Sequence, residues 1–372
     1  MALVAACGLL AACGDDAASE PGATDVAETD GAATDVAATE PRATDAAPTA
    51  AEATSLAALL AAAPAPAVGA GDRAGLVYVT YGDLDAVGEL IGVARPANAD
   101  PDTVIDWAIT LSMDGSDDGS QVAVAVLPRL VTEGGADPAE MEAELGWQVG
   151  DVAAFLEIST GPENVTLVTG DIAEADLAAA GTPDGDTWRI GDGEDFESNL
   201  DSVTPVRRLG QPLHLAWRDG IALVSRSTAA AEGFASGTSS LLDAQPGLAA
   251  VAAPLAARGV HGAILTTIVA DDPFFDALGV GQAVVDGQRV ALFAYHAPDA
   301  ATAAELEATV RDTLATGSPA TADGTWAELF PGAEVAAEGE TVLAILPLAP
   351  TTSAQLPWRT VLMGDGLAPP TR

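Results

Sequence analysis

Hydrophobic and polar positions follow two different periods once the chain passes Leu56. In "GLVYVTYGDLDAVGELIG", residues 75–92, a run typical of a β-strand ends at a Gly-Asp pair. Apolar residues then recur at helical spacing, at Leu84, Val87, Leu90 and Ile91. "NVTLVTGDIAEADLAAAG", residues 164–181, has the same order of strand, Gly-Asp, helix and closing glycine. The pattern predicts two related units.

Three dipeptides separate further apolar runs and predict β-hairpins. Asp219-Gly220 lies between "LHLAW" and "IALVS", Asp286-Gly287 between "QAVV" and "RVALFAY", and Glu338-Gly339 between "AEVAA" and "TVLAIL". An Asp-Gly pair suits a type I′ turn, because both central residues of that turn need positive φ. The strands on either side are therefore expected to pair antiparallel.

Two helices are predicted among these strands. Pro246 is expected to open a helix that Pro254 kinks or splits, and Thr302 with Glu305 forms a candidate capping box for another. Strand hairpins with intervening helices predict an α+β fold, with antiparallel sheets, helices packed on one face and two related subdomains.

The N-terminal segment has a different character. Residues 1–12, "MALVAACGLLAA", resemble the second half of a secretory signal and are too short to span a bilayer. The basic segment that begins such signals is missing, which a translation start further upstream would explain. Leu10-Ala11-Ala12-Cys13 resembles the lipobox of bacterial lipoproteins. The resemblance implies that Cys13 carries a lipid anchor and that the residues before it are removed.

The residues after Cys13 are acidic and repetitive. "ATDVA" occurs at 23–27 and again at 33–37, and the segment has no large apolar face to bury. It is expected to be a disordered tether, with an interaction tail as the alternative. The predicted organisation is a signal peptide over 1–12, the lipidated cysteine and tether over 13–55, and α+β subdomains over 56–205 and 206–372.

Charge excludes several partners and chemistries. The formal net charge is −41, and all 14 basic residues are arginines. Such a surface repels nucleic acid and anionic headgroups. The absence of lysine excludes Schiff bases, a P-loop and S-x-x-K acylation. The two cysteines both lie in the leader, so the folded part has no disulfide and no thiolate metal site.

Catalytic signals are sparse. None of the three histidines has a second ligand at metal-binding spacing. Ser225, His214 and Asp219 supply the residue types of a triad, but no G-x-S-x-G elbow marks a nucleophile. We therefore expect no enzymatic activity, no cofactor and no metal, and Cys13 is the only site residue assigned.

Three other features leave alternatives open. "DGSDDGS", 114–120, and "DGDTWRIGDGEDFE", 184–197, are either weak calcium sites or acidic hairpin tips, and the second interpretation is favoured. Arg207-Arg208, the only basic pair, either contacts an anionic ligand or neutralises neighbouring acids. The six tryptophans are core candidates, and a sugar-binding platform would need several of them exposed together.

The folded part also resembles known proteins. The succession "VYVTYGDLDAVGELIGV", "VTLVTGDI", "RRLGQPLHLAWRDGIALVSRS" and "GTSSLLDAQPGLAAVAAPL" is similar to segments of uncharacterised exported lipoproteins of high-GC actinobacteria. The resemblance implies no activity. We expect a non-enzymatic binding or envelope-associated module, lipid-anchored at the extracytoplasmic face of the cell membrane. A solute-binding lipoprotein of a transporter and a hydrolase are the alternatives.

Overall fold

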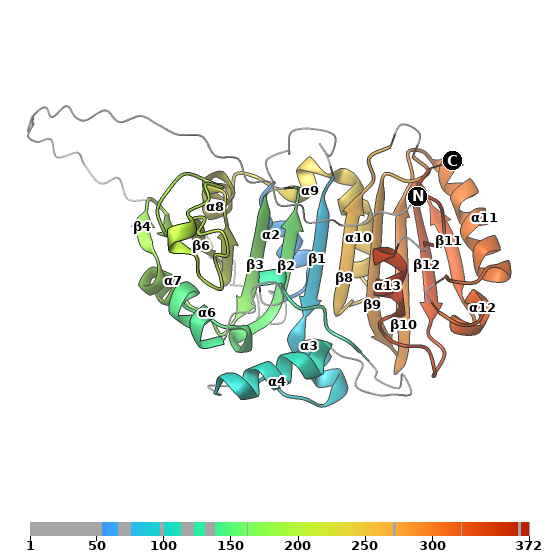
Figure 1. Cartoon of the computed structure of the whole chain (residues 1–372). Coiled ribbons are helices and arrows are strands. Elements are labelled where there is room, and N and C mark those ends of the chain that lie inside the picture. The colour runs from blue at the N-terminus through green and yellow to red at the C-terminus, as the bar shows by residue number, and fades with distance from the viewer. Residues whose placement is uncertain are drawn as a thin grey trace, which may run out of the picture. The chain divides into compact units, whose positions relative to one another are not determined.

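Twelve strands form one antiparallel sheet in the computed structural model (Figure 1). The structure describes residues 54–65, 76–96, 100–112, 123–130, 138–161, 163–270, 273–320, 322–363 and 366–371. In chain order the strands are β1 Tyr78–Asp83, β2 Val152–Ser159, β3 Asn164–Gly170, β4 Thr182–Asp184, β5 Thr187–Ile190, β6 Leu213–Arg218, β7 Ile221–Ser225, β8 Gly262–Thr267, β9 Ala277–Val285, β10 Gln288–His296, β11 Glu334–Glu338 and β12 Thr341–Pro347. Their order in the sheet is β11-β12-β10-β9-β8-β1-β2-β3-β7-β6-β5-β4. The predicted α+β class with antiparallel strands is confirmed.

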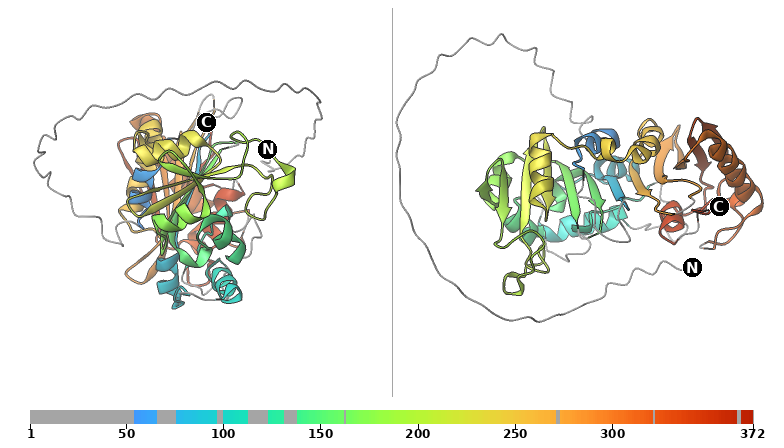
Figure 2. Two further views of the ribbon diagram at one scale, coloured as in Figure 1. Left: turned by 90° about the vertical axis from the view of Figure 1, so that its left-hand side faces the viewer. Right: turned by 90° about the horizontal axis from the view of Figure 1, so that it is seen from above.

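Helices pack on both faces of this sheet, as the view from above in Figure 2 shows. They are α2 Leu56–Ala62, α3 Leu84–Ile91, α4 Pro101–Ser112, α6 Pro138–Leu145, α7 Glu174–Ala180, α8 Thr228–Ser236, α9 Leu241–Ala244, α10 Pro246–Ala256, α11 Ala300–Thr316, α12 Trp326–Leu329 and α13 Leu356–Leu362, with 3₁₀ turns η1 Val149–Asp151 and η2 Leu200–Ser202. None of the described helices combines the length and apolarity of a membrane span.

The prediction that helices cover only one face is wrong. Helices α2, α8, α9 and α10 pack against one face, while α3, α4, α6, α7, α11, α12 and α13 pack against the other. The physical reason is visible in β10, where Val290 and Leu292 belong to one core and Phe293 and Tyr295 to the opposite core. A strand with large apolar residues at both parities must be buried on both faces.

The sheet contains a topological repeat centred on the β1–β8 pair. Outward from β1 the order is β1-β2-β3-β7-β6, and outward from β8 it is β8-β9-β10-β12-β11. In each half a hairpin is followed by a helix, α7 or α11, and later by a second hairpin, β6-β7 or β11-β12, that lies beside the first in the sheet; in the first half β4 and β5 intervene. The junction of the repeat lies between β7 and β8. The boundary predicted after residue 205 falls inside the first half, between β5 and β6, which are hydrogen-bonded neighbours.

Local signals set most of the turns and helix ends. Asp219-Gly220 and Asp286-Gly287 form the predicted hairpin turns, with positive φ at all four residues. The third hairpin turns at Gly339-Glu340 instead, because Glu338 still pairs with Thr341.

Two helix predictions need correction. Pro246 opens α10 as predicted, but Pro254 lies inside its last turns and does not split it. The proposed capping box at Thr302 is wrong: α11 begins earlier, and the Asp299 side chain caps it by accepting from the Thr302 backbone N–H.

Candidate functional site

A stripe of polar side chains crosses the middle of the sheet on the face that carries α3, α6, α7 and α13. Alternate residues of β1, β2 and β3 supply it: Tyr78, Thr80, Glu157, Ser159, Asn164 and Thr166. The register aligns them in two rows, Tyr78–Ser159–Asn164 and Thr80–Glu157–Thr166. The intervening residues, such as Val79 and Leu156, point into the continuous core on the other face. On the stripe side the apolar core is divided into two clusters, one in each half.

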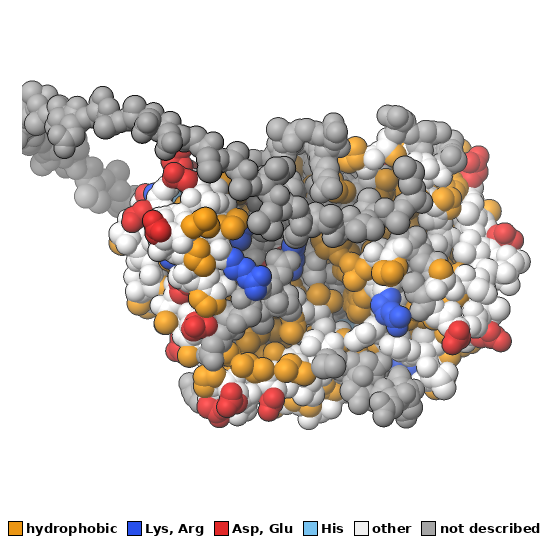
Figure 3. Space-filling view, viewed as in Figure 1, with side chains coloured by type: hydrophobic (Ala, Val, Ile, Leu, Met, Phe, Trp, Pro, Cys, Tyr) orange, Lys and Arg blue, Asp and Glu red, His pale blue; other side chains and the backbone are white. Residues whose placement is uncertain are grey.

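This polar stripe is the floor of a small cleft of about 100 Å³. Three arginines line it, Arg129, Arg208 and Arg226, and they come from three separate segments of the chain. Glu157 is the one acidic residue among its described lining residues. Figure 3 shows basic side chains (blue) beside hydrophobic ones (orange) in the middle of this face. In a chain of net charge −41, this concentration of arginine creates a local environment suited to an anion.

Glu157 fixes the segment that carries Arg129. Its carboxylate accepts hydrogen bonds from the Arg129 backbone N–H at 2.8 Å and from the Thr166 hydroxyl at 3.2 Å. Gly82 permits the close approach of the same segment to β1, because a Cβ there would lie 2.8 Å from the Val126 carbonyl oxygen. The segment 123–130 is thereby held across the strands, with Arg129 at the cleft.

Burial and nearby charge have opposite effects on the pKa values of two groups in the cleft floor, Glu157 and Tyr78. Glu157 is only 8% exposed, and burial raises the pKa of its carboxyl group, while its hydrogen bonds and the Arg129 charge oppose the rise. Burial also raises the pKa of Tyr78, against a hydrogen bond with Thr80 and the charge of Arg129. The Arg129 charge therefore opposes the rise in pKa of two groups of the polar floor, Glu157 and Tyr78.

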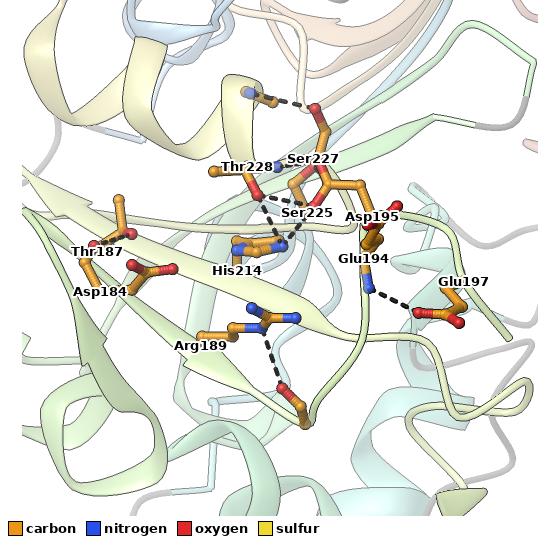
Figure 4. Close-up of polar contacts among 12 residues, drawn as sticks. Asp184, Thr187, Arg189, Glu194, Asp195, Glu197, His214, Ser225, Ser227 and Thr228 are labelled. Carbon is orange, nitrogen blue, oxygen red and sulfur yellow. Dashed lines mark hydrogen bonds and ion pairs between the residues drawn. The ribbon is translucent and has the colours of Figure 1, made fainter. Parts of the chain in front are cut away.

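The loop between β5 and β6 brings Arg208 to the cleft. Asp195 anchors this loop to the body: its carboxylate accepts from both the backbone N–H and the hydroxyl of Thr228, each at 2.7 Å (Figure 4). The same carboxylate lies 2.9 Å from Nε2 of His214, which is 1% exposed. The Gln211 side chain adds a bond to the Phe196 carbonyl. Gly210 closes the loop at φ 63°, where a Cβ would collide with the Asn199 carbonyl.

The two arginines of the basic pair Arg207-Arg208 have different surroundings. Arg207 points to Glu144 on α6 and forms a half-buried ion pair with it. Arg208 lies on the cleft wall. One arginine thus neutralises a neighbouring acid, and the next contributes charge to the candidate site.

The structure does not assemble the triad that the sequence suggested. His214 and Ser225 are cross-strand partners, but the carboxylate at His214 is Asp195. Asp219 lies at the hairpin turn with its side chain 77% exposed. The Ser225 hydroxyl is buried, donates to the Asn164 carbonyl and accepts from the Ser227 N–H. These groups are held by structural hydrogen bonds.

Some of the residues singled out in the sequence lie outside the described part of the chain, and others can be located. Cys13, Cys7 and "DGSDDGS" at 114–120 lie outside the described residues. In the segment 184–197, the Asp184 carbonyl accepts from Thr187 in a hairpin, whereas Asp195 bonds to Thr228 (Figure 4). Within the described ranges, histidine, cysteine and acidic residues form no group of three that would hold a metal ion.

The tryptophans are packing residues. Four of them are buried: Trp107, Trp147, Trp326 and Trp358. The other two, Trp188 and Trp217, are half-buried and pack against the apolar cluster of the first half of the sheet, on the cleft side. A platform of exposed tryptophans is therefore not formed. Trp358 on α13 nevertheless lines an apolar groove beside the cleft.

The sequence carries a signal for the polar stripe that our predictions did not include. In "VYVTY", "FLEIS" and "NVTLVTG", polar residues occupy alternate positions between apolar ones. This pattern also describes an ordinary strand with one solvated face. Only the register, which places three such strands side by side, distinguishes a cleft floor from scattered surface positions.

Comparison with protein-family models and with curated proteins finds no match for the chain. Among solved structures, the one titled "Structure of crystal form I of TP0453" matches with a TM-score of 0.33 and 8% sequence identity. The match covers 82% of this chain and 96% of that one. Similarity at this level carries no argument about function.

Proposed function

We propose that the chain is a lipid-anchored, non-enzymatic binding protein that holds an anionic ligand in the cleft over β1, β2 and β3. The observation that carries the proposal is the convergence of Arg129, Arg208 and Arg226 on one polar cleft. A guanidinium group offers paired N–H donors that match carboxylate or phosphate oxygens. The hydroxyl and amide groups of the floor supply further hydrogen bonds to such a ligand.

The first test uses inorganic phosphate as the probe and the full chain as the protein. Phosphate should raise the melting temperature more than chloride at equal ionic strength, because a ligand of the native state stabilises it by mass action. Arg208→Gln and Arg226→Gln should each weaken binding about tenfold, since a hydrogen bond to a charged group contributes about 1.5–3 kcal/mol.

The matched control is Arg311→Gln, which removes the same charge from α11, where Arg311 pairs with Glu307. This variant should bind phosphate like the wild type. Equal effects of phosphate and chloride, or equal weakening by all three substitutions, would contradict an arginine-dependent anion site.

The membrane anchor is tested separately. Cys13 follows the apolar run 8–12 and precedes Gly14-Asp15-Asp16, as a lipidated N-terminus requires. Metabolic labelling with a fatty-acid analogue should mark the chain with its complete native leader and fail on Cys13→Ser. Cys7→Ser should keep the label. The opposite pattern would assign the lipid to Cys7.

A further inference from the structure

An apolar groove of about 530 Å³ lies beside the arginine cleft. Its apolar lining comes from the segment 123–130, from β8 and from α13: Val124, Val126, Leu127, Ile264, Trp358 and Leu362. Arg129 and Arg359 are the only charged residues among the described residues that line it. Its volume is within the range of about 300–1,000 Å³ typical of small-molecule sites.

The groove and the cleft are adjacent. Tyr78, Thr80 and Arg129 line both, so the anion site and the apolar groove share one wall. The groove lies where the two halves of the sheet meet, because β1 belongs to one half and Ile264 of β8 to the other. A ligand that fills both spaces would have a small charged end and a larger apolar end.

The apolar end of the site is open to solvent at α13. Leu362 is 63% exposed although it lines the groove, and its neighbour Met363 is 72% exposed. Covering Leu362 with a hydrocarbon chain removes apolar surface from water, which favours binding. The charge pattern also favours an anionic amphiphile, because the charged residues of the groove, Arg129 and Arg359, are both cationic and no described acidic residue lines it.

We infer that the ligand is a single-chain amphiphile with an anionic head, the head at Arg129, Arg208 and Arg226 and the hydrocarbon chain in the groove. This inference rests on the proposed function of the cleft. One chain is specified because the groove has the size of a single small-molecule site. Phosphate and carboxylate heads share the chemistry that the arginines recognise.

The experiment is a calorimetric titration of the full chain with n-alkyl phosphates of increasing length, from butyl to dodecyl, below their micelle concentrations. The dissociation constant should fall about fourfold for each added methylene until the groove is filled, because each buried methylene contributes about 0.8 kcal/mol. n-Alkyl carboxylates of the same lengths form the second arm and identify which head binds more tightly. Either preference agrees with the inference.

Two sets of variants separate the groove from the cleft. Leu362→Asn and Leu127→Asn should flatten the dependence on chain length and leave phosphate binding intact. Arg208→Gln should weaken every ligand by a similar factor and keep that dependence. Met363→Asn is the matched control, since Met363 is exposed on the same helix end and is not among the groove-lining residues.

Each outcome is decisive for one of the two claims. Affinity that does not change with chain length while phosphate still binds through the arginines overturns the amphiphile and preserves the anion site. A dependence on length that survives in both groove variants also overturns it. If Arg208→Gln binds phosphate and the alkyl phosphates as tightly as the wild type, the proposed function itself is overturned. Tryptophan fluorescence provides a second measurement. A hydrocarbon chain in the groove should change the fluorescence of Trp358, and that change should be absent in Trp358→Phe.

Discussion

Asp83 and Glu157 are carboxylates whose pKa values are raised because burial disfavours their charged forms. At Glu157 the hydrogen bonds from the segment 123–130 oppose the rise, so the carboxylate connects that segment to the cleft floor. At Asp83 the nearby charges of Asp85 and Glu89 add to burial, and the pKa rises to about 6. Asp83 also caps α3 by accepting from the Ala86 N–H at 2.9 Å.

Asp83→Asn should stabilise the protein at pH 7 and give little gain near pH 4. The folded carboxyl group, with a pKa of about 6, binds its proton more tightly than the unfolded chain, where the value is near 3.8. Its contribution to the free energy of unfolding is therefore present below pH 3.8 and is lost as pH rises through 6. Asparagine keeps the cap without the charge. Urea unfolding should show a gain of about 1–2 kcal/mol at pH 7; the same gain at both pH values would contradict this assignment.

At the scale of elements, the cleft depends on segments that lie outside the sheet. The strands supply the polar floor, but Arg129 comes from the segment 123–130 and Arg208 from the loop between β5 and β6. Each segment is held by a buried or half-buried carboxylate, Glu157 for the first and Asp195 for the second. The positions of Arg129 and Arg208 therefore depend on Glu157 and Asp195 as well as on the strands.

Asp195→Ala should weaken anion binding several-fold and lower the melting temperature, because the Thr228 groups and the buried His214 lose their acceptor. The substitution removes both bonds to Thr228 and the contact with His214, so the loop that carries Arg208 loses one of its attachments and keeps the ion pair of Arg207 with Glu144. The control is Asp192→Ala, which removes the same charge from an exposed position of that loop. Phosphate and alkyl phosphate titrations of both variants measure the effect. Equal affinities in the two variants would show that charge, and not loop attachment, matters.

At the scale of the whole molecule, the two halves of the sheet meet at β1 and β8. The apolar groove lies at this seam, and the arginine cleft lies beside it, over β1, β2 and β3 of the first half. The core on the opposite face is continuous across the seam, whereas on the cleft side each half has its own cluster. Packing on one face joins the halves, and the gap between clusters on the other face leaves room for a ligand. The surrounding surface belongs to a chain of net charge −41.

Monovalent salt should stabilise the protein progressively. Raising NaCl from about 0.05 M to about 0.5 M brings the Debye length below about 8 Å and screens repulsion among the carboxylates. The melting temperature should therefore rise over this range. Millimolar calcium added in the high-salt buffer should cause no further rise. A calcium shift that persists there and disappears in Asp118→Asn would establish a site in the segment 114–120.

Features that depend on near neighbours in the chain could be predicted from the sequence. Asp219-Gly220 and Asp286-Gly287 specify their turns because positive φ is a property of those residues. The α+β class and helices α3, α7 and α10 follow from the period of apolar positions. The start of α2 at Leu56, where the predicted folded part begins, coincides with Ser55 as its N-cap.

The positions of the helices on the sheet and the contacts among polar residues depend on tertiary packing. Whether a buried strand carries helices on one face or both depends on packing partners far away in sequence, so the two-sided arrangement was missed. The cleft exists because β1 pairs with β2, β2 with β3 and β3 with β7, which brings Glu157 and Arg226 to one stripe. Glu157 in turn holds the segment that carries Arg129. The alternating Thr, Glu and Asn residues of these strands form one stripe only through that pairing. Strand register is set by contacts among segments that are distant in the sequence.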